Sequence, residues 1–354
     1  FYTTIGGWML AYFVKMAKGD FKGLDAEGVG QAFNSLTTDM GTMIIWMLIV
    51  VIIGFTVCSL GLQSGVERIT KAMMVILLLL MIVLAVNSCL LPGASDGLKF
   101  YLMPDFKKLT EYGLSEVIFA AMGQAFFTLS LGIGALAIFG SYIGKERKLT
   151  GEAINILVLD TFVALTAGLI IFPACSAFGV NPGEGPGLVF VTLPNVFNNM
   201  KGGRFWGSLF FLFMSFAALS TIIAVFQNII SFAHDLWNLS LKKAVLVNGI
   251  AIVILSLPCI FGMTIWSDFS ILGKSILDFE DFLVSNNMLP LGSLVYLLFC
   301  VNRYGWGWKN FLAEANTGAG VSFPKQIKVY LTFVLPIIVL YIFVQGYWGL
   351  IQSL

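Results

Sequence analysis

Long apolar runs separated by short polar segments dominate this sequence. Runs of about 20 residues bounded by charge, Gly and Pro are candidate spans, because that length crosses a bilayer as a helix. The first is a partial span from Phe1 to about Met16. Full candidates follow at about 39–61, 67–91, 115–143, 150–178, 204–233, 242–263, 283–302 and 328–350. The pattern therefore predicts an all-α polytopic membrane protein with about nine spans in a single transmembrane domain, residues 1–354.

Composition supports this class and excludes others. Hydrophobic residues make up 58% of the chain, charged residues only 11%, and the mean hydropathy is +0.92. A soluble exterior needs more charge, whereas lipid solvates apolar side chains. The net charge of +1 lacks the basic field of a nucleic-acid binder. Five dispersed cysteines without a CxxC pair, and His234 as the only histidine, indicate neither a zinc site nor a redox motif.

The loops alternate in charge along the chain. Loops 61–71, 144–150, 235–243 and 303–328 are rich in Lys and Arg, and the intervening loops carry most of the acids. The positive-inside rule predicts that the basic loops are cytoplasmic, in a multi-pass protein of the cell (plasma or inner) membrane. The outer loop 181–204 begins with turn residues and continues as an apolar helix. We expect this helix to be a re-entrant lid.

One mid-span segment, Gly123-Gln-Ala-Phe-Phe-Thr-Leu-Ser-Leu-Gly-Ile-Gly-Ala135, combines glycines with polar side chains. Two glycines at i and i+2 favour unwinding of the helix, and unwound backbone in a membrane lines a cavity where carbonyls can coordinate cations. A glycine-mediated contact between helices is the alternative interpretation.

A second constellation is Phe216-Ala-Ala-Leu-Ser-Thr221. Ala217, Ser220 and Thr221 stand at i, i+3 and i+4 and share one helix face. Their neutral oxygens suit a small cation such as Na⁺. The alternative is that each hydroxyl bonds a carbonyl of its own helix.

Asp160 is an acid within the predicted span 150–178. A charge at that depth is costly and marks an ion or proton site. If the span begins later in the sequence, Asp160 lies nearer the interface and needs no such role.

Together these segments resemble the neurotransmitter:sodium symporter family, particularly its prokaryotic amino-acid transporters with the LeuT-type fold. The resemblance covers essentially the whole chain. The segments that carry it are Gly6-Gly-Trp8, Gly123–Gly134, Gly185-Pro-Gly-Leu-Val-Phe-Val-Thr-Leu-Pro194, Ala217–Thr221, and Asp281-Phe-Leu-Val-Ser-Asn with Leu289-Pro-Leu-Gly292. The resemblance implies an inverted-repeat fold with broken helices. The nine spans then resemble helices three to eleven, so the family's first two helices are expected to lie outside this sequence.

The resemblance also implies a substrate site. In the family, the residue matching Tyr2 bonds the substrate carboxylate, and that matching Phe127 is an aromatic lid. Ser130 and Ile133 border the break and the side-chain pocket, and Thr128, Thr221 and Val225 line the same site. Apolar walls at 127, 133 and 225 favour a neutral, hydrophobic or aromatic L-amino acid.

Two sodium sites follow from the same resemblance. Thr128 and Asp160 match the first site, and the Ala217 carbonyl, Ser220 and Thr221 match the second. Asp160 departs from the family's asparagine. A fixed carboxylate there could balance charge near Gln124 in place of chloride, so we expect chloride independence. Asp281 matches the acidic half of the outer gate.

The expected function is therefore sodium-coupled symport of an amino acid across the lipid bilayer by alternating access. Two alternatives within this fold are a non-transporting or channel-like protein and an inactive fragment. An intramembrane enzyme is a further alternative, although no Ser, Asp or His pair has a catalytic spacing.

Overall fold

The computed structural model describes residues 1–61, 66–179 and 186–353. The chain divides into two compact units, each described here by itself. Unit 1 comprises Phe1–Pro104, Val163–Ser270 and Ser275–Leu277. Unit 2 comprises Asp105–Phe162, Ile271–Lys274 and Asp278–Leu354.

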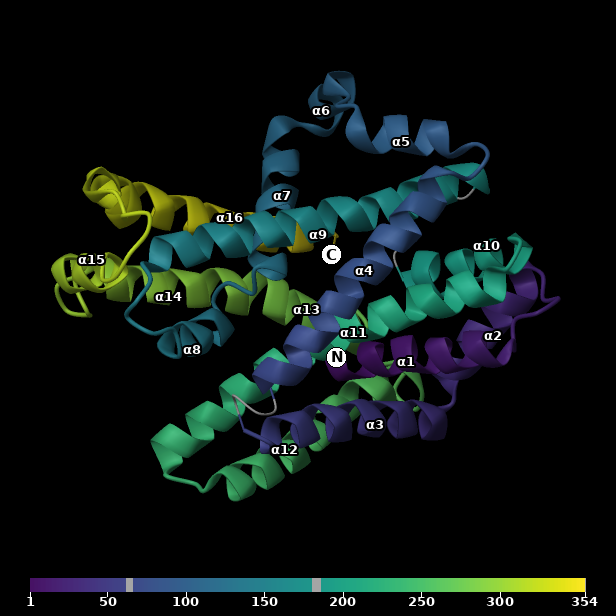
Figure 1. Ribbon diagram of the computed structural model, residues 1–354, viewed down its shortest axis with the longest axis horizontal. Helices are drawn as coiled ribbons and strands as arrows, with labels where there is room; N and C mark the ends of the chain where they lie inside the picture. Colours follow the sequence, from purple (N-terminus) through teal and green to yellow (C-terminus); the bar gives the residue numbers. More distant parts are fainter. Residues whose placement is uncertain (62–65, 180–185, 354) are drawn as a thin grey trace. The chain divides into compact units, whose positions relative to one another are not determined.

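Unit 1 is built around two long antiparallel neighbours, α1 and α11, with α3 and α4 packed against them and α12 against α3 (Figure 1). Its helices are α1 (Tyr2–Lys18), α2 (Ala26–Thr38), α3 (Met40–Ser59), α4 (Arg68–Cys89), α5 (Ala94–Leu102), the second part of α9 (Leu149–Ala177), a π-helical turn at Leu188–Thr192, α10 (Leu193–Asn199), α11 (Gly203–Trp237) and α12 (Leu241–Met263).

Small residues allow these helices to approach closely. A Cβ added to Gly7 on α1 would lie 3.0 Å from the backbone nitrogen of Met47 on α3. Membrane helices are not pressed together by water, so their association depends on such close van der Waals contact.

An aromatic cluster joins the loop helices to this core. Phe190, in the π-helical turn, stacks on Phe33 of α2 at 5.2 Å between ring centroids. Its ring also meets Trp8 and Tyr12 of α1 edge to face, at 5.6 and 5.1 Å. Such pairs stabilise beyond the area they bury, so Phe190 anchors the segment 188–199 to α1 and α2.

Unit 2 has its core between α7, α14 and α16, where Phe126, Leu289, Val339 and Ile342 are buried together. Its helices are α6 (Phe106–Tyr112), α7 (Leu114–Thr128), α8 (Ala135–Ser141), the first part of α9, most of α13 (Ile276–Leu283), a π-helical turn at Val284–Met288, α14 (Leu289–Val301), α15 (Trp308–Ala315), a 3₁₀ turn at Lys325–Ile327, a π-helical turn at Tyr330–Val334 and α16 (Leu335–Ser353).

Seven helical stretches among the described residues are long and apolar enough to cross a membrane. They are Met40–Ser59, Arg68–Cys89, Leu149–Ala177, Gly203–Trp237, Leu241–Met263, Ile276–Val301 and Lys325–Tyr347. The predicted all-α membrane fold is confirmed. Of the two remaining predicted spans, Phe1–Met16 is the 17-residue helix α1, and 115–143 is interrupted between α7 and α8.

Candidate functional site

The predicted break in the span 115–143 is present. Helix α7 ends with two backbone hydrogen bonds, from the Leu131 N–H to the Phe126 carbonyl and from the Ser130 N–H to the Phe127 carbonyl, both 3.0 Å. This pairing is the Schellman motif, which places one residue in the left-handed region. That residue is Ser130, with φ +50°, where glycine is usual. The chain re-enters a helix only at Ala135.

Gly132 in the break also makes a backbone contact with α14. A Cβ at Gly132 would lie 2.3 Å from the Leu289 carbonyl oxygen, and one at Gly292 would lie 2.3 Å from the Gly132 oxygen. Gly132 additionally has φ +85°. The helix is therefore unwound here as predicted, and the same glycine also mediates the contact between helices of the alternative interpretation.

Asp160 and Thr128 meet beside this break. The Thr128 hydroxyl donates a hydrogen bond of 2.9 Å to Oδ1 of Asp160. Because α9 begins at Leu149, Asp160 lies about 16 Å along the helix from that end. The acid is thus inside the span and not at its edge, which favours an ionic role over the interfacial alternative.

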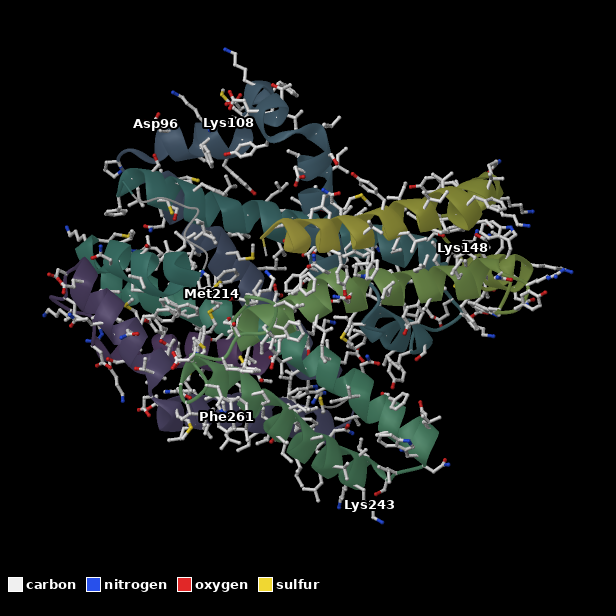
Figure 2. The ribbon with its side chains drawn as sticks, turned by 180° about the vertical axis from the view of Figure 1, so that it is seen from behind. Asp96, Lys108, Lys148, Met214, Lys243 and Phe261 are labelled. Carbon is white, nitrogen blue, oxygen red and sulfur yellow. The ribbon has the colours of Figure 1, made fainter. Side chains whose placement is uncertain are left out.

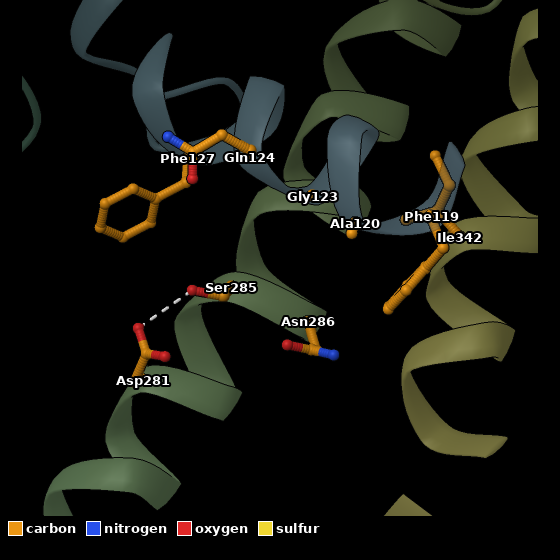
Figure 3. Close-up of a pocket in the computed structure, with 9 residues that line it drawn as sticks. All are labelled: Phe119, Ala120, Gly123, Gln124, Phe127, Asp281, Ser285, Asn286 and Ile342. Carbon is orange, nitrogen blue, oxygen red and sulfur yellow. Dashed lines mark hydrogen bonds between the residues drawn. The ribbon is translucent and has the colours of Figure 1, made fainter. Parts of the chain in front are cut away.

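A cavity of about 380 Å³ opens next to the end of α7 (Figure 3). Three residues singled out from the sequence, Gln124, Phe127 and Asp281, line it. In Figure 3 the Phe127 ring and the Asp281 carboxylate both extend into the space on the Ser285 side of the cavity. The Ser285 hydroxyl donates to Asp281 Oδ1 at 3.1 Å, which holds the carboxylate in place.

Sequence reasoning missed two polar lining residues, Ser285 and Asn286. Both belong to the π-helical turn Val284–Met288 at the junction of α13 and α14. A π-turn widens the helix by one residue and is frequent at functional sites. The available signal was Ser-Asn-Asn at the start of the apolar run 283–302.

Ile133, the last predicted pocket residue in this unit, packs against the buried cluster around Phe126 and Leu289. Its side chain therefore contributes to the core that supports the break.

The remaining predicted residues lie in unit 1. The side chain of Tyr2 on α1 lies beside that of Thr221 on α11. The Ser220 and Thr221 hydroxyls both donate to the Ala217 carbonyl, at 2.9 and 3.3 Å. Val225, one turn further along α11, is half-buried.

These intrahelical bonds match the alternative interpretation of this segment, yet they leave it able to bind a cation. A hydroxyl that donates its proton to a carbonyl keeps lone pairs that can accept or coordinate. The segment thus presents three neutral oxygens on one helix face, which is a suitable donor set for Na⁺.

The sequence model of the sodium:neurotransmitter symporter family matches residues 27–352. The chain belongs to this family. It is 35% identical to the uncharacterised sodium-dependent transporter YhdH of Bacillus subtilis, over 98% of this chain and 76% of the relative. An uncharacterised sodium-dependent transporter of Haemophilus influenzae is 32% identical, over 98% of this chain and 75% of its own length.

Among solved structures, the fold is similar to the crystal structure of MhsT in complex with L-phenylalanine. The TM-score is 0.86 at 35% identity, covering 98% of this chain and 77% of MhsT. The family and the fold agree with the resemblance seen in the sequence. The chain is therefore a multi-pass, sodium-dependent membrane transporter and not an enzyme.

Proposed function

We propose that this member of the sodium:neurotransmitter symporter family cotransports Na⁺ with a neutral, hydrophobic or aromatic L-amino acid, without a need for chloride. The observation that carries the proposal is the Thr128–Asp160 hydrogen bond beside an unwound helix. A carboxylate and a hydroxyl at membrane depth form a hard-oxygen site that is costly unless a cation or proton uses it.

Two sodium sites are part of the proposal. Thr128 and Asp160 would hold one ion, and the Ala217 carbonyl with the Ser220 and Thr221 hydroxyls would hold the other. At each site the bound Na⁺ would offset the cost of placing these polar oxygens at membrane depth. The Asp160 carboxylate would also balance the charge of this Na⁺ in place of chloride, which is the reason to expect chloride independence.

The substrate class rests on the side chains assigned to its pocket. Phe127, Ile133 and Val225 are apolar, and the Tyr2 hydroxyl is the proposed partner of the substrate carboxylate. The L-phenylalanine bound to MhsT, at 35% identity, supports an apolar side chain on the substrate. Ser130 borders this pocket at the break.

Alternating access requires that the outer side of the pathway closes over bound substrate. Phe127 is 38% exposed and lines the cavity with Gln124 and Asp281, so it is free to act as the lid. The segment 188–199 is the proposed re-entrant lid helix of loop 181–204, of which residues 181–185 lie outside the described residues.

Binding of tritiated Leu, Tyr, Phe and Trp to the purified protein, in NaCl against KCl, tests the proposal. We expect saturable binding in NaCl only, with Na⁺ gluconate as effective as NaCl. Binding that is equal in KCl contradicts sodium coupling, and binding that needs chloride contradicts the role of Asp160. Uptake against a gradient in proteoliposomes distinguishes a symporter from a channel-like protein.

Two variants localise the first sodium site. Thr128→Ala removes the hydroxyl, and loss of a charged hydrogen bond or ligand weakens Na⁺ affinity by about 10-fold or more. Thr128→Ser keeps the oxygen and is the matched control, for which we expect near-native affinity. Equal sodium dependence of the two variants would remove Thr128 from the site.

A further inference from the structure

An apolar groove of about 440 Å³ runs along the outer face of unit 1, between α3 and α12. Phe55, Thr56 and Ser59 line it from α3, and Leu246, Gly249 and Ile250 line it from α12. Leu246 and Ile250 are 64% and 54% exposed, so the described residues leave this groove open. Figure 1 shows the two helices side by side over this stretch.

The groove has the length of one membrane leaflet. On α12 it extends from Val245 to Ile254, which is about 14 Å at 1.5 Å per residue. The hydrocarbon core of a bilayer is about 30 Å thick, so a single leaflet contributes about half. The groove lies toward the Ser59 end of α3 and the Leu241 end of α12, which adjoin the basic loops assigned to the cytoplasm.

A lysine continues the groove at this end. The lining positions of α12 repeat in pairs, 245 and 246, 249 and 250, 253 and 254. Lys242 stands four residues before Leu246 and therefore on the same helix face, with Lys243 beside it. Both lysines are exposed, and the described residues offer neither of them an ion pair. Figure 2 shows Lys243 at the end of α12, where α11 connects to it.

We propose that this groove is a binding site for an anionic phospholipid of the cytoplasmic leaflet. One acyl chain lies along the groove, over the floor that Phe55 and Gly249 form and beside Leu246, and the phosphate group contacts Lys242 and Lys243. The apolar walls suit a hydrocarbon chain, and two exposed ammonium groups at the headgroup level select negative charge.

The same charges disfavour a second copy of the chain as the occupant. A two-fold dimer through this face would place two identical Lys242–Lys243 pairs at the same depth, near one another. Like charges across an interface oppose association. A zwitterionic lipid would also fill the groove, but its neutral headgroup would be attracted less strongly by the two lysines.

Native mass spectrometry of the purified full chain tests the proposal. The protein in detergent is titrated with phosphatidylglycerol and with phosphatidylcholine that carry identical acyl chains. We expect retention of phosphatidylglycerol to be favoured about 25-fold, because each of the two lysines near the surface contributes roughly fivefold. Equal retention of the two lipids overturns the proposal.

Three variants assign the lipid to this groove. Lys242→Gln with Lys243→Gln should reduce the preference to near unity. The matched pair Lys325→Gln with Lys328→Gln removes two basic charges from unit 2 and should leave the preference for phosphatidylglycerol unchanged. Gly249→Leu fills the groove, and its Cβ would lie 3.7 Å from Phe55, an ordinary contact, so it should weaken retention of both lipids.

Other outcomes are decisive as well. An unchanged preference in the Lys242/Lys243 variant overturns the assignment even if Gly249→Leu fails to fold. Lipid-free dimers that Gly249→Leu dissociates would show that a second copy covers the groove. Displacement of the lipid by millimolar inorganic phosphate would indicate an anion site without an acyl chain, and would also refute the proposal.

Discussion

The contact between Gly132 and Gly292 makes a quantitative prediction. Alanine at 132 must adopt a left-handed φ, which costs about 1–2 kcal/mol. Its Cβ would also meet the Leu289 carbonyl oxygen at 2.3 Å, a backbone atom that cannot turn away. Overpacking of this kind costs about 1–3 kcal/mol. We therefore expect Gly132→Ala to lower the free energy of unfolding by about 2–5 kcal/mol.

Gly292→Ala isolates the steric part of this cost. Gly292 lies in α14, where alanine is favoured over glycine by about 1 kcal/mol. The Cβ that this substitution adds would, however, clash with the Gly132 oxygen at 2.3 Å, and we expect this clash to destabilise the protein by about 2–3 kcal/mol. The expected net loss is about 1–2 kcal/mol, smaller than that for Gly132→Ala.

Thermal unfolding followed by tryptophan fluorescence, in one detergent, measures these differences. Gly140→Ala is the matched control, because Gly140 lies in α8 and its Cβ would meet nothing within 4 Å. A Gly132→Ala midpoint equal to that of Gly140→Ala would refute the close contact. The double variant should lose less than the sum of the single losses, since both residues share one contact. Strict additivity would mean that the two costs arise separately.

Three further predictions concern single residues. Ser130→Gly should stabilise the protein by about 1 kcal/mol, because glycine adopts the left-handed φ without strain; a lower melting temperature would mean that the hydroxyl contributes more than the strain costs. Phe190→Ala should destabilise by about 3–5 kcal/mol, since its ring is 2% exposed, whereas Phe205→Ala, at 61% exposure, should change the melting temperature little. The Thr42 hydroxyl, followed by the Thr42 and Gly41 amides, lowers the pKa of the Asp39 carboxyl. Ionised Asp39 therefore stabilises α3 above a pH of about 4 and loses this effect as pH falls through its lower folded pKa. Asp39→Asn, an equally good cap, should remove that part of the acid dependence of melting; an unchanged profile would contradict it.

Most of the fold followed from the hydropathy pattern. Each span is an apolar run long enough to cross a bilayer, and in lipid such a run must satisfy its backbone within its own helix. The break after Thr128 was also visible, because Gly132, Gly134 and Ser130 are poor helix residues within an apolar run.

The π-helical turn at Val284–Met288 was not visible in the same way. Its residues also fit an ordinary α-helix, and whether an extra residue enters the turn depends on how α13 and α14 pack against their neighbours. Ser285 and Asn286 were therefore missed as residues that line the cavity with Asp281.

Hydropathy and helix periodicity could not decide which polar groups meet; the family resemblance grouped Thr128 with Asp160, and only the tertiary structure showed the contacts themselves. Thr128 and Asp160 are 32 residues apart, Tyr2 and Thr221 lie on different helices, and Gly132 contacts Gly292 backbone to backbone. Sequence periodicity sets the face on which a residue lies, but it does not select the neighbouring helix. Between helices in lipid there is no hydrophobic force to make that choice, so close packing of small residues and hydrogen bonds between specific partners determine it.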